Sequence, residues 1–156
     1  MYPMKAIANF FIDRAMKEGA EMSPMKIQKL LYFAYGIYHV KTGEPLFSDR
    51  FEVWKYGPVI SELYHLLKGY GSDQIDRLLP DFDMATMRVV TPTIPREEKE
   101  LLVFLTEFWE VYRGYSPIRL SNATHLPGTP WDEANRAGEK VISDQRMDAY
   151  FSGLVQ

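Results

Sequence analysis

The sequence lacks the residues on which several common protein chemistries depend. It has no cysteine, which excludes a disulfide framework and thiolate chemistry and fits a reducing compartment. Its three histidines, His39, His65 and His125, stand in no metal-binding spacing such as HExxH, so we expect no metal site. The stretch GYGSD is too short for a phosphate-binding loop and lacks a lysine. These absences argue against an enzyme and against a bound cofactor.

Clustered positive charge and long apolar runs are also missing. The chain has 18 basic and 21 acidic residues, a net charge of -3, so we expect no direct nucleic-acid binding. Its nearest basic pair, Lys26 and Lys29, is expected to be solvated. No stretch reaches the roughly 18 to 20 apolar residues of a membrane span, and residues 1–19 are too charged for a signal peptide. We therefore expect a cytoplasmic protein without a membrane partner.

The residues that are present indicate one folded domain. The chain has 156 residues, of which 46% are apolar and 25% charged, an ordinary balance for a globular protein. This length suits a single core, so we assign residues 1–156 to one domain. Apolar residues recur mostly at helical spacing, which predicts a mainly α fold.

The aromatic-rich stretch SPMKIQKLLYFAYG predicts the central helix of that fold. Ser23 stands where a helix N-cap accepts backbone hydrogen bonds, and Pro24 occupies the first helical position. Gly43 provides the stop. The segment is apolar on nearly every face, which is typical of a helix surrounded by protein. We therefore expect a compact helical domain built around this helix.

Further helices are expected before and after it. Residues 96–115 predict a long amphipathic helix that buries Leu101, Phe104, Leu105, Phe108 and Val111. Gly57 and Pro58 are expected to begin another helix. The other expected helical segments are 3–18, 72–79, 116–125, 131–138 and 143–154.

One small β element is the exception to the helical pattern. Alternating residues over 45–56 predict a short strand, and the only partner that the sequence offers is 87–93. The segment 80–83 is expected to be a loop.

Ser121 and His125 formally offer an enzymatic alternative. They stand four residues apart on one helical face, as a nucleophile and its base would. The sequence has no GxSxG elbow and no identifiable orienting acid, so we interpret His125 as structural. Trp131, which follows Pro130, is expected to be a packed aromatic anchor.

Six segments together resemble a known family. They are, in order, IANFFI, SPMKIQKLLYFAYG, GEPLF, FEVWKYGPVISELY, LSNATH and TPWDEA. This order resembles the Panacea domain family, which includes the SocA and GepA proteins of bacteria and phages. Short pieces such as YGPV are weak by themselves, whereas six in order over 7–131 are specific. The chain departs from the family at Ile27 and Tyr35, where members often carry Leu and Gln.

The resemblance implies a non-enzymatic antitoxin in a mainly helical single domain. Such a protein binds and neutralises a cognate protein toxin encoded next to it. The SocA branch acts as an adaptor that delivers its toxin to a cytosolic AAA+ protease, so this protease is a second implied partner. Direct inhibition and delivery to the protease both remain open. The alternative is a phage or prophage regulatory or interaction protein without a toxin partner.

The motifs divide into structural and partner-binding residues. The expected structural set is Ser23, Pro24, Gly57, Pro58, Ser121, His125, Pro130 and Trp131. Tyr and His can lie half in a core and half in an interface, and the central helix has more apolar faces than one core contact needs. We therefore place the partner surface on the exposed motif edges, at Tyr35, His39, Lys55, Tyr56, Glu62 and His65. The competing interpretation is that neighbouring helices simply enclose the central helix. If the toxin is held elsewhere, residues 144–151 are the next candidate.

Overall fold

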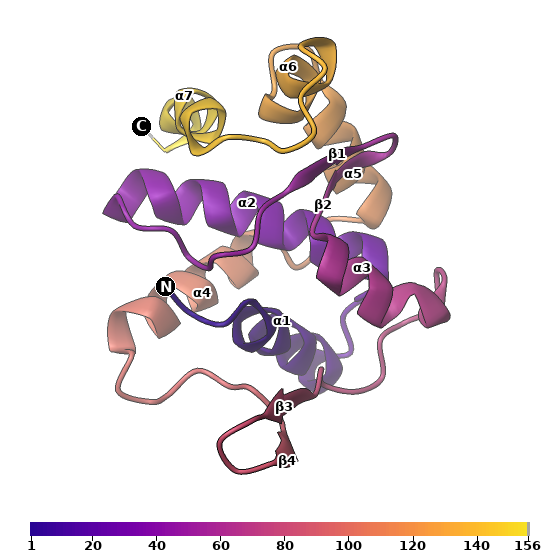
Figure 1. Ribbon diagram of the computed structural model, residues 1–156, viewed down its shortest axis with the longest axis vertical. Coiled ribbons are helices and arrows are strands. Elements are labelled where there is room, and N and C mark those ends of the chain that lie inside the picture. Colours follow the sequence, from indigo (N-terminus) through magenta and orange to yellow (C-terminus); the bar gives the residue numbers. More distant parts are fainter. Residues whose placement is uncertain (156) are drawn as a thin grey trace.

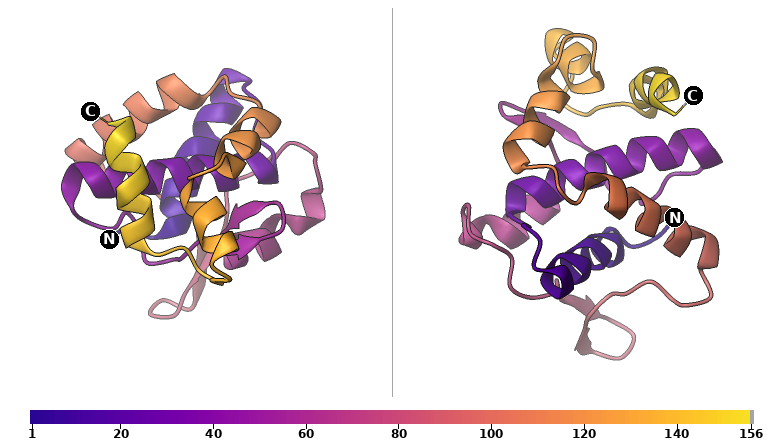
Figure 2. Two further views of the ribbon diagram at one scale, coloured as in Figure 1. Left: turned by 90° about the horizontal axis from the view of Figure 1, so that it is seen from above. Right: turned by 180° about the vertical axis from the view of Figure 1, so that it is seen from behind.

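Helix α2 (Pro24–Thr42) runs through the middle of the molecule, and the other helices are arranged around it (Figure 1). Helix α1 (Met4–Glu18) lies on one side, while α6 (Pro130–Arg136) and α7 (Asp144–Leu154) lie on the other. Seen from behind in Figure 2, α4 (Lys99–Tyr112) and α5 (Pro117–His125) lie along the back of α2. The expected mainly α fold is confirmed in this computed structural model, which describes residues 1–155.

Local sequence signals define both ends of α2 as expected. The Ser23 hydroxyl accepts a hydrogen bond from the Lys26 amide, and Pro24 is the first helical residue. Gly43 ends the helix with a φ of 75°, a left-handed conformation that a residue with a Cβ rarely adopts. Every residue from 26 to 36 is buried. This stretch of α2 is therefore enclosed by its neighbours.

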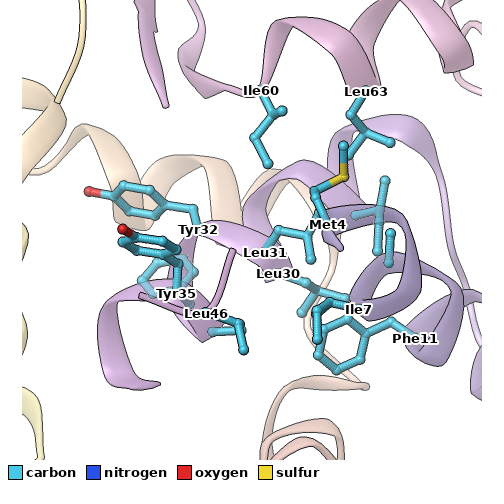
Figure 3. Packing of buried hydrophobic residues seen from close by; sticks show 14 of the residues in the cluster. Met4, Ile7, Phe11, Leu30, Leu31, Tyr32, Tyr35, Leu46, Ile60 and Leu63 are labelled. Carbon is cyan, nitrogen blue, oxygen red and sulfur yellow. The ribbon is translucent and has the colours of Figure 1, made fainter. Parts of the chain in front are cut away.

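The core forms where α1, α2 and α3 (Ser61–Leu67) meet. Met4, Ile7 and Phe11 of α1 gather against Leu30 and Leu31 of α2, and Ile60 and Leu63 approach from the side of α3 (Figure 3). At the other end of α2, Gly36 lies directly under the buried ring of Phe151 in α7. This contact lets α2 and α7 approach closely because Gly36 has no Cβ.

The strands pair differently from the prediction. Strand β1 (Glu52–Trp54) pairs with β2 (Gly57–Val59), its nearest neighbour in the chain. Strand β4 (Arg88–Val90) pairs with β3 (Asp81–Asp83), in the segment expected to be a loop. The predicted pairing between 45–56 and 87–93 is wrong, because each segment closes a local antiparallel hairpin instead. The β3–β4 hairpin extends away from the helices, below α1 in Figure 1.

Two helix predictions also need correction. Gly57 and Pro58 do not begin a helix but form strand β2, and α3 begins at Ser61. Residues 72–79 are not helical, although the 3₁₀ turn η1 (Lys68–Tyr70) precedes them.

Helix α4 is present, but its inward face is not entirely the expected one. Leu101, Leu105 and Phe108 are buried as predicted, whereas Val111 is 60% exposed. Trp109 takes the buried position instead, and its Nε1 donates to the Glu18 carboxylate at 3.1 Å. The indole buries its ring and still satisfies its N–H at the edge of the core.

Candidate partner-binding groove

A tight hairpin turn forms the centre of the candidate site. Trp54 pairs with Gly57 across the turn formed by Lys55 and Tyr56. Gly57 has a φ of 120°, which favours glycine. A Cβ at Gly57 would lie 3.0 Å from Lys29 Nζ and 3.1 Å from the His125 ring. The YGP motif therefore needs glycine both for its backbone angle and for its close packing.

Two side chains of α2 hold this hairpin. Lys29 Nζ donates a hydrogen bond to the Pro58 carbonyl at 3.1 Å. The Gln28 side chain donates to the Ile60 carbonyl at 3.0 Å and accepts from the Ile60 amide at 2.9 Å. These bonds satisfy backbone groups at the end of β2 and fix the start of α3 relative to α2.

The expectation that Lys26 and Lys29 are solvated is wrong. Both are buried, at 1% and 3% exposure. Lys26 Nζ donates a hydrogen bond to the Arg113 carbonyl at 2.5 Å, and Lys29 Nζ donates to the Pro58 carbonyl. The amphipathic pattern of helices did not reveal this, because a long lysine stem packs like an apolar side chain.

Lys29 has no carboxylate within ion-pair distance in the part of the chain that the structure describes. Burial disfavours its charged form and lowers its pKa from 10.5 to about 8. At neutral pH this side chain is therefore a buried ammonium whose charge is balanced only by dipoles.

Replacing Lys29 with methionine is expected to change how stability depends on pH. Because burial lowers the folded-state pKa from 10.5 to about 8, the unfolded chain binds the proton more tightly. The stability associated with the neutral amine is fully present above the unfolded pKa and is lost as pH falls through about 8. The free energy of unfolding of the wild type should therefore rise by about 2 kcal/mol relative to Lys29→Met between about pH 7 and about pH 9.5. Urea unfolding of both proteins at the two pH values measures this difference. An equal change in the free energy of unfolding of the wild type and of Lys29→Met would contradict the prediction.

Trp131 of α6 and His125 of α5 also pack against the hairpin. Trp131 is 7% exposed, its Nε1 donates to the Trp54 carbonyl at 2.9 Å, and its ring centre lies 4.3 Å from that of His125. The packed position expected for Trp131 is confirmed. His125 Nδ1 lies 2.7 Å from the backbone carbonyl of Ser121 and 3.2 Å from the Thr124 hydroxyl. Within residues 1–155, His125 makes no hydrogen bond to the Ser121 hydroxyl, so the geometry favours the structural interpretation of this pair.

An apolar groove of about 470 Å³ lies between the start of α2, the β1–β2 hairpin and α3. Several of its lining side chains are large and partly exposed: Met25, Tyr56 and Tyr64 are 44%, 70% and 43% exposed. Trp54 packs edge-on against Tyr64, with ring centres 4.9 Å apart. A larger hollow of about 550 Å³ lies beside the start of α4, but charged side chains dominate its rim.

The predicted partner residues fall into separate places. Lys55 and Tyr56 line the groove. Glu62 and His65 are exposed on α3 outside it, and Glu62 lies 3.4 Å from Lys5 of α1. The groove residues that sequence reasoning missed include Met25, Lys29, Trp54 and Tyr64. The signal that could have found Lys29 is a lysine within a helix that is apolar on nearly every face.

Tyr35 and His39 lie at the other end of α2, against α7. Tyr35 is 2% exposed, so the expectation that it lies at an exposed edge is wrong. Its hydroxyl donates to Asp144 at 2.9 Å, and burial together with this bond raises its pKa. His39 Nδ1 lies 2.6 Å from Asp148, and its ring stacks on Tyr35. In this structure the pair attaches α7 to α2.

The described residues offer neither a membrane span nor a metal cluster. Among the helices that the structure describes, none combines the length and apolarity needed to cross a membrane. Across residues 1–155, no group of three or more acidic or histidine side chains is arranged to hold a metal ion.

The hairpin, most of the groove and α2 from residue 27 onward lie within a stretch that matches a known family. The family described as "Antitoxin SocA-like, Panacea domain" matches residues 27–132, and the chain belongs to this family. Among individual proteins, the chain is similar to Antitoxin SocA of Caulobacter vibrioides (strain NA1000 / CB15N). The two are 29% identical over 153 residues, which cover 90% of this chain and 80% of that protein. No solved structure matches the chain. The resemblance inferred from the motifs is confirmed.

Proposed function

We propose that this protein is an antitoxin that binds and neutralises a protein toxin encoded by a neighbouring gene. The observation that carries the proposal is the family match, since it includes the hairpin and most of α2 and of the groove. We place the toxin contact on the groove and its rim, where Lys55 and Tyr56 lie. We further propose that the protein works in the cytoplasm.

The side-chain chemistry around the groove supports a binding role. Trp and Tyr offer large, stiff contact surfaces with little loss of conformational entropy, and they dominate binding hot spots. The buried bonds from Gln28 and Lys29 hold the hairpin in place, so the aromatic residues on it need little reorganisation.

Neutralisation has two routes that make different demands on this surface. In direct inhibition, the bound chain covers or distorts the working part of the toxin. In the adaptor route, the chain also contacts a cytosolic AAA+ protease and passes the toxin to it. Direct inhibition works with purified components at equal concentrations, whereas the adaptor route requires the protease and shortens the lifetime of the toxin.

Co-expression tests the antitoxin proposal. Each neighbouring open reading frame is placed under an inducible promoter, with and without this chain on a second plasmid. We expect one frame to arrest growth when induced alone and growth to resume when the chain is supplied. A version with an early stop codon is the control for the plasmid. Pulse-chase of the toxin, with and without the AAA+ protease of the host, separates the two routes.

The same experiment can also contradict the antitoxin proposal. If no neighbouring frame arrests growth and the purified chain binds none of their products, the antitoxin proposal is wrong. The phage or prophage regulatory protein without a toxin then becomes the better explanation.

A further inference from the structure

The charge of the groove differs in sign from that of the whole chain. Its lining residues include two lysines, Lys29 and Lys55, and no aspartate or glutamate. The chain as a whole carries a net charge of -3, so this local excess of positive charge does not follow from composition. Charge complementarity across interfaces favours partners of the opposite sign.

The two lysines differ in how well their charges are already satisfied. Lys55 is exposed on the hairpin turn, and its Nζ lies 5.4 Å from the centre of the Tyr56 ring. Lys29 is buried, and an ammonium has three donors, of which one is used by the Pro58 carbonyl. A buried charge without a counter-charge is costly, and a carboxylate brought by a partner removes part of that cost.

The rest of the lining suits apolar side chains. Met25 has a flexible thioether chain that adapts to different shapes, and Trp54, Tyr56 and Tyr64 present aromatic faces and edges. The lining therefore combines an apolar surface with cationic groups at its floor and at its rim. Two lysines are too few for a phosphate backbone, which needs many cationic contacts.

We propose that the groove binds a short peptide segment of a protein partner in which apolar side chains stand next to a carboxylate. The apolar side chains pack against Trp54 and Tyr64, and the carboxylate faces the lysines. This inference rests on the proposed function in one respect, because it identifies the partner as the toxin and the segment as the part of the toxin that is recognised.

Selection from a random peptide library tests the chemistry without knowledge of the toxin. The probe is a library of 12-residue peptides displayed on phage and selected against the immobilised chain. We expect enriched peptides to carry Asp or Glu beside Leu, Phe, Met or Trp. A fluorescent copy of the most enriched peptide should lose about tenfold in affinity when its carboxylates are replaced by amides, a change of about 1.4 kcal/mol. Fluorescence anisotropy measures both affinities.

Variants locate the peptide on the chain. Lys55→Glu and Tyr56→Ser change two exposed groove residues and should each weaken binding of the peptide about tenfold or more. The matched controls are Lys140→Glu and Ile118→Ser, exposed residues outside the groove lining, which should bind the peptide like the wild type. Circular dichroism melting checks that all four variants remain folded.

Several outcomes would overturn the inference. These are no enrichment over the starting library, enrichment of basic or uncharged peptides, equal affinity for the amide version, and groove variants that bind like the controls.

The same variants separate this inference from the proposed function. If the wild type restores growth and Lys55→Glu and Tyr56→Ser restore it equally well, the antitoxin role stands and the groove inference fails. If the wild type fails to restore growth against every neighbouring frame, the antitoxin role fails. The peptide selection alone then decides whether the groove binds such a peptide.

Discussion

Replacing Gly36 with alanine is expected to destabilise the protein by at least about 2 kcal/mol, despite the better helix propensity of alanine. A Cβ at this position would lie 2.2 Å from Cδ2 and 2.7 Å from Cγ of Phe151. Phe151 has 0% exposure, so its ring has no free space to enter. Overpacking must therefore push α7 away from α2. The free energy of unfolding from urea titration measures the loss.

A second glycine provides a matched control for Gly36. Gly153 also lies in a helix, α7, but a Cβ there meets nothing within 4 Å. Gly153→Ala should leave stability unchanged or raise it by up to about 1 kcal/mol. Combining Gly36→Ala with Phe151→Leu should recover part of the loss, because the two residues share one contact. If Gly36→Ala is as stable as the wild type, α2 and α7 do not pack as closely as described.

Replacing Trp131 with alanine is expected to cost about 3 to 5 kcal/mol, the usual range for truncating a buried Trp. The substitution empties the space beside His125 and leaves the Trp54 carbonyl without its donor. For a domain of this size, such a loss lowers the melting temperature by about 6 to 20 °C. Thermal unfolding followed by circular dichroism measures the shift.

Trp131→Phe distinguishes the two parts of this effect. Phenylalanine keeps most of the buried ring but cannot donate to the Trp54 carbonyl, so its cost should be clearly smaller than that of alanine. An unchanged melting temperature for Trp131→Ala would show that the indole is not part of the core. Loss of toxin neutralisation with an unchanged melting temperature would instead make Trp131 a contact residue.

The helices that the sequence predicted best carry their signals within a few residues. Ser23, Ser116 and Ser143 each accept an N-cap hydrogen bond from the amide three residues later. Gly19 and Gly43 end α1 and α2 in the left-handed conformation. These signals are local, because capping and φ depend on neighbouring residues and not on the rest of the fold.

The strand pairs were harder to predict from the sequence because short segments lack a distinctive pattern. Each strand has three residues, too few for alternation to show a period or a partner. Pro58 and Gly57 looked like a helix start, since proline is common at the first helical position. In the fold they form β2, because Lys29 and Gln28 of α2 hydrogen-bond to the Pro58 carbonyl and the Ile60 backbone.

By itself, the sequence determined the family, the central helix and the helical caps, because ordered motifs, apolar periodicity and capping residues are all written along the chain. Only the tertiary structure decided which residues share the groove and which charges are buried. Lys29 and Tyr35 illustrate the reason: a lysine and a tyrosine each fit both a surface and a core, and their surroundings come from segments far along the chain. Such contacts depend on how helices pack, which no local pattern records.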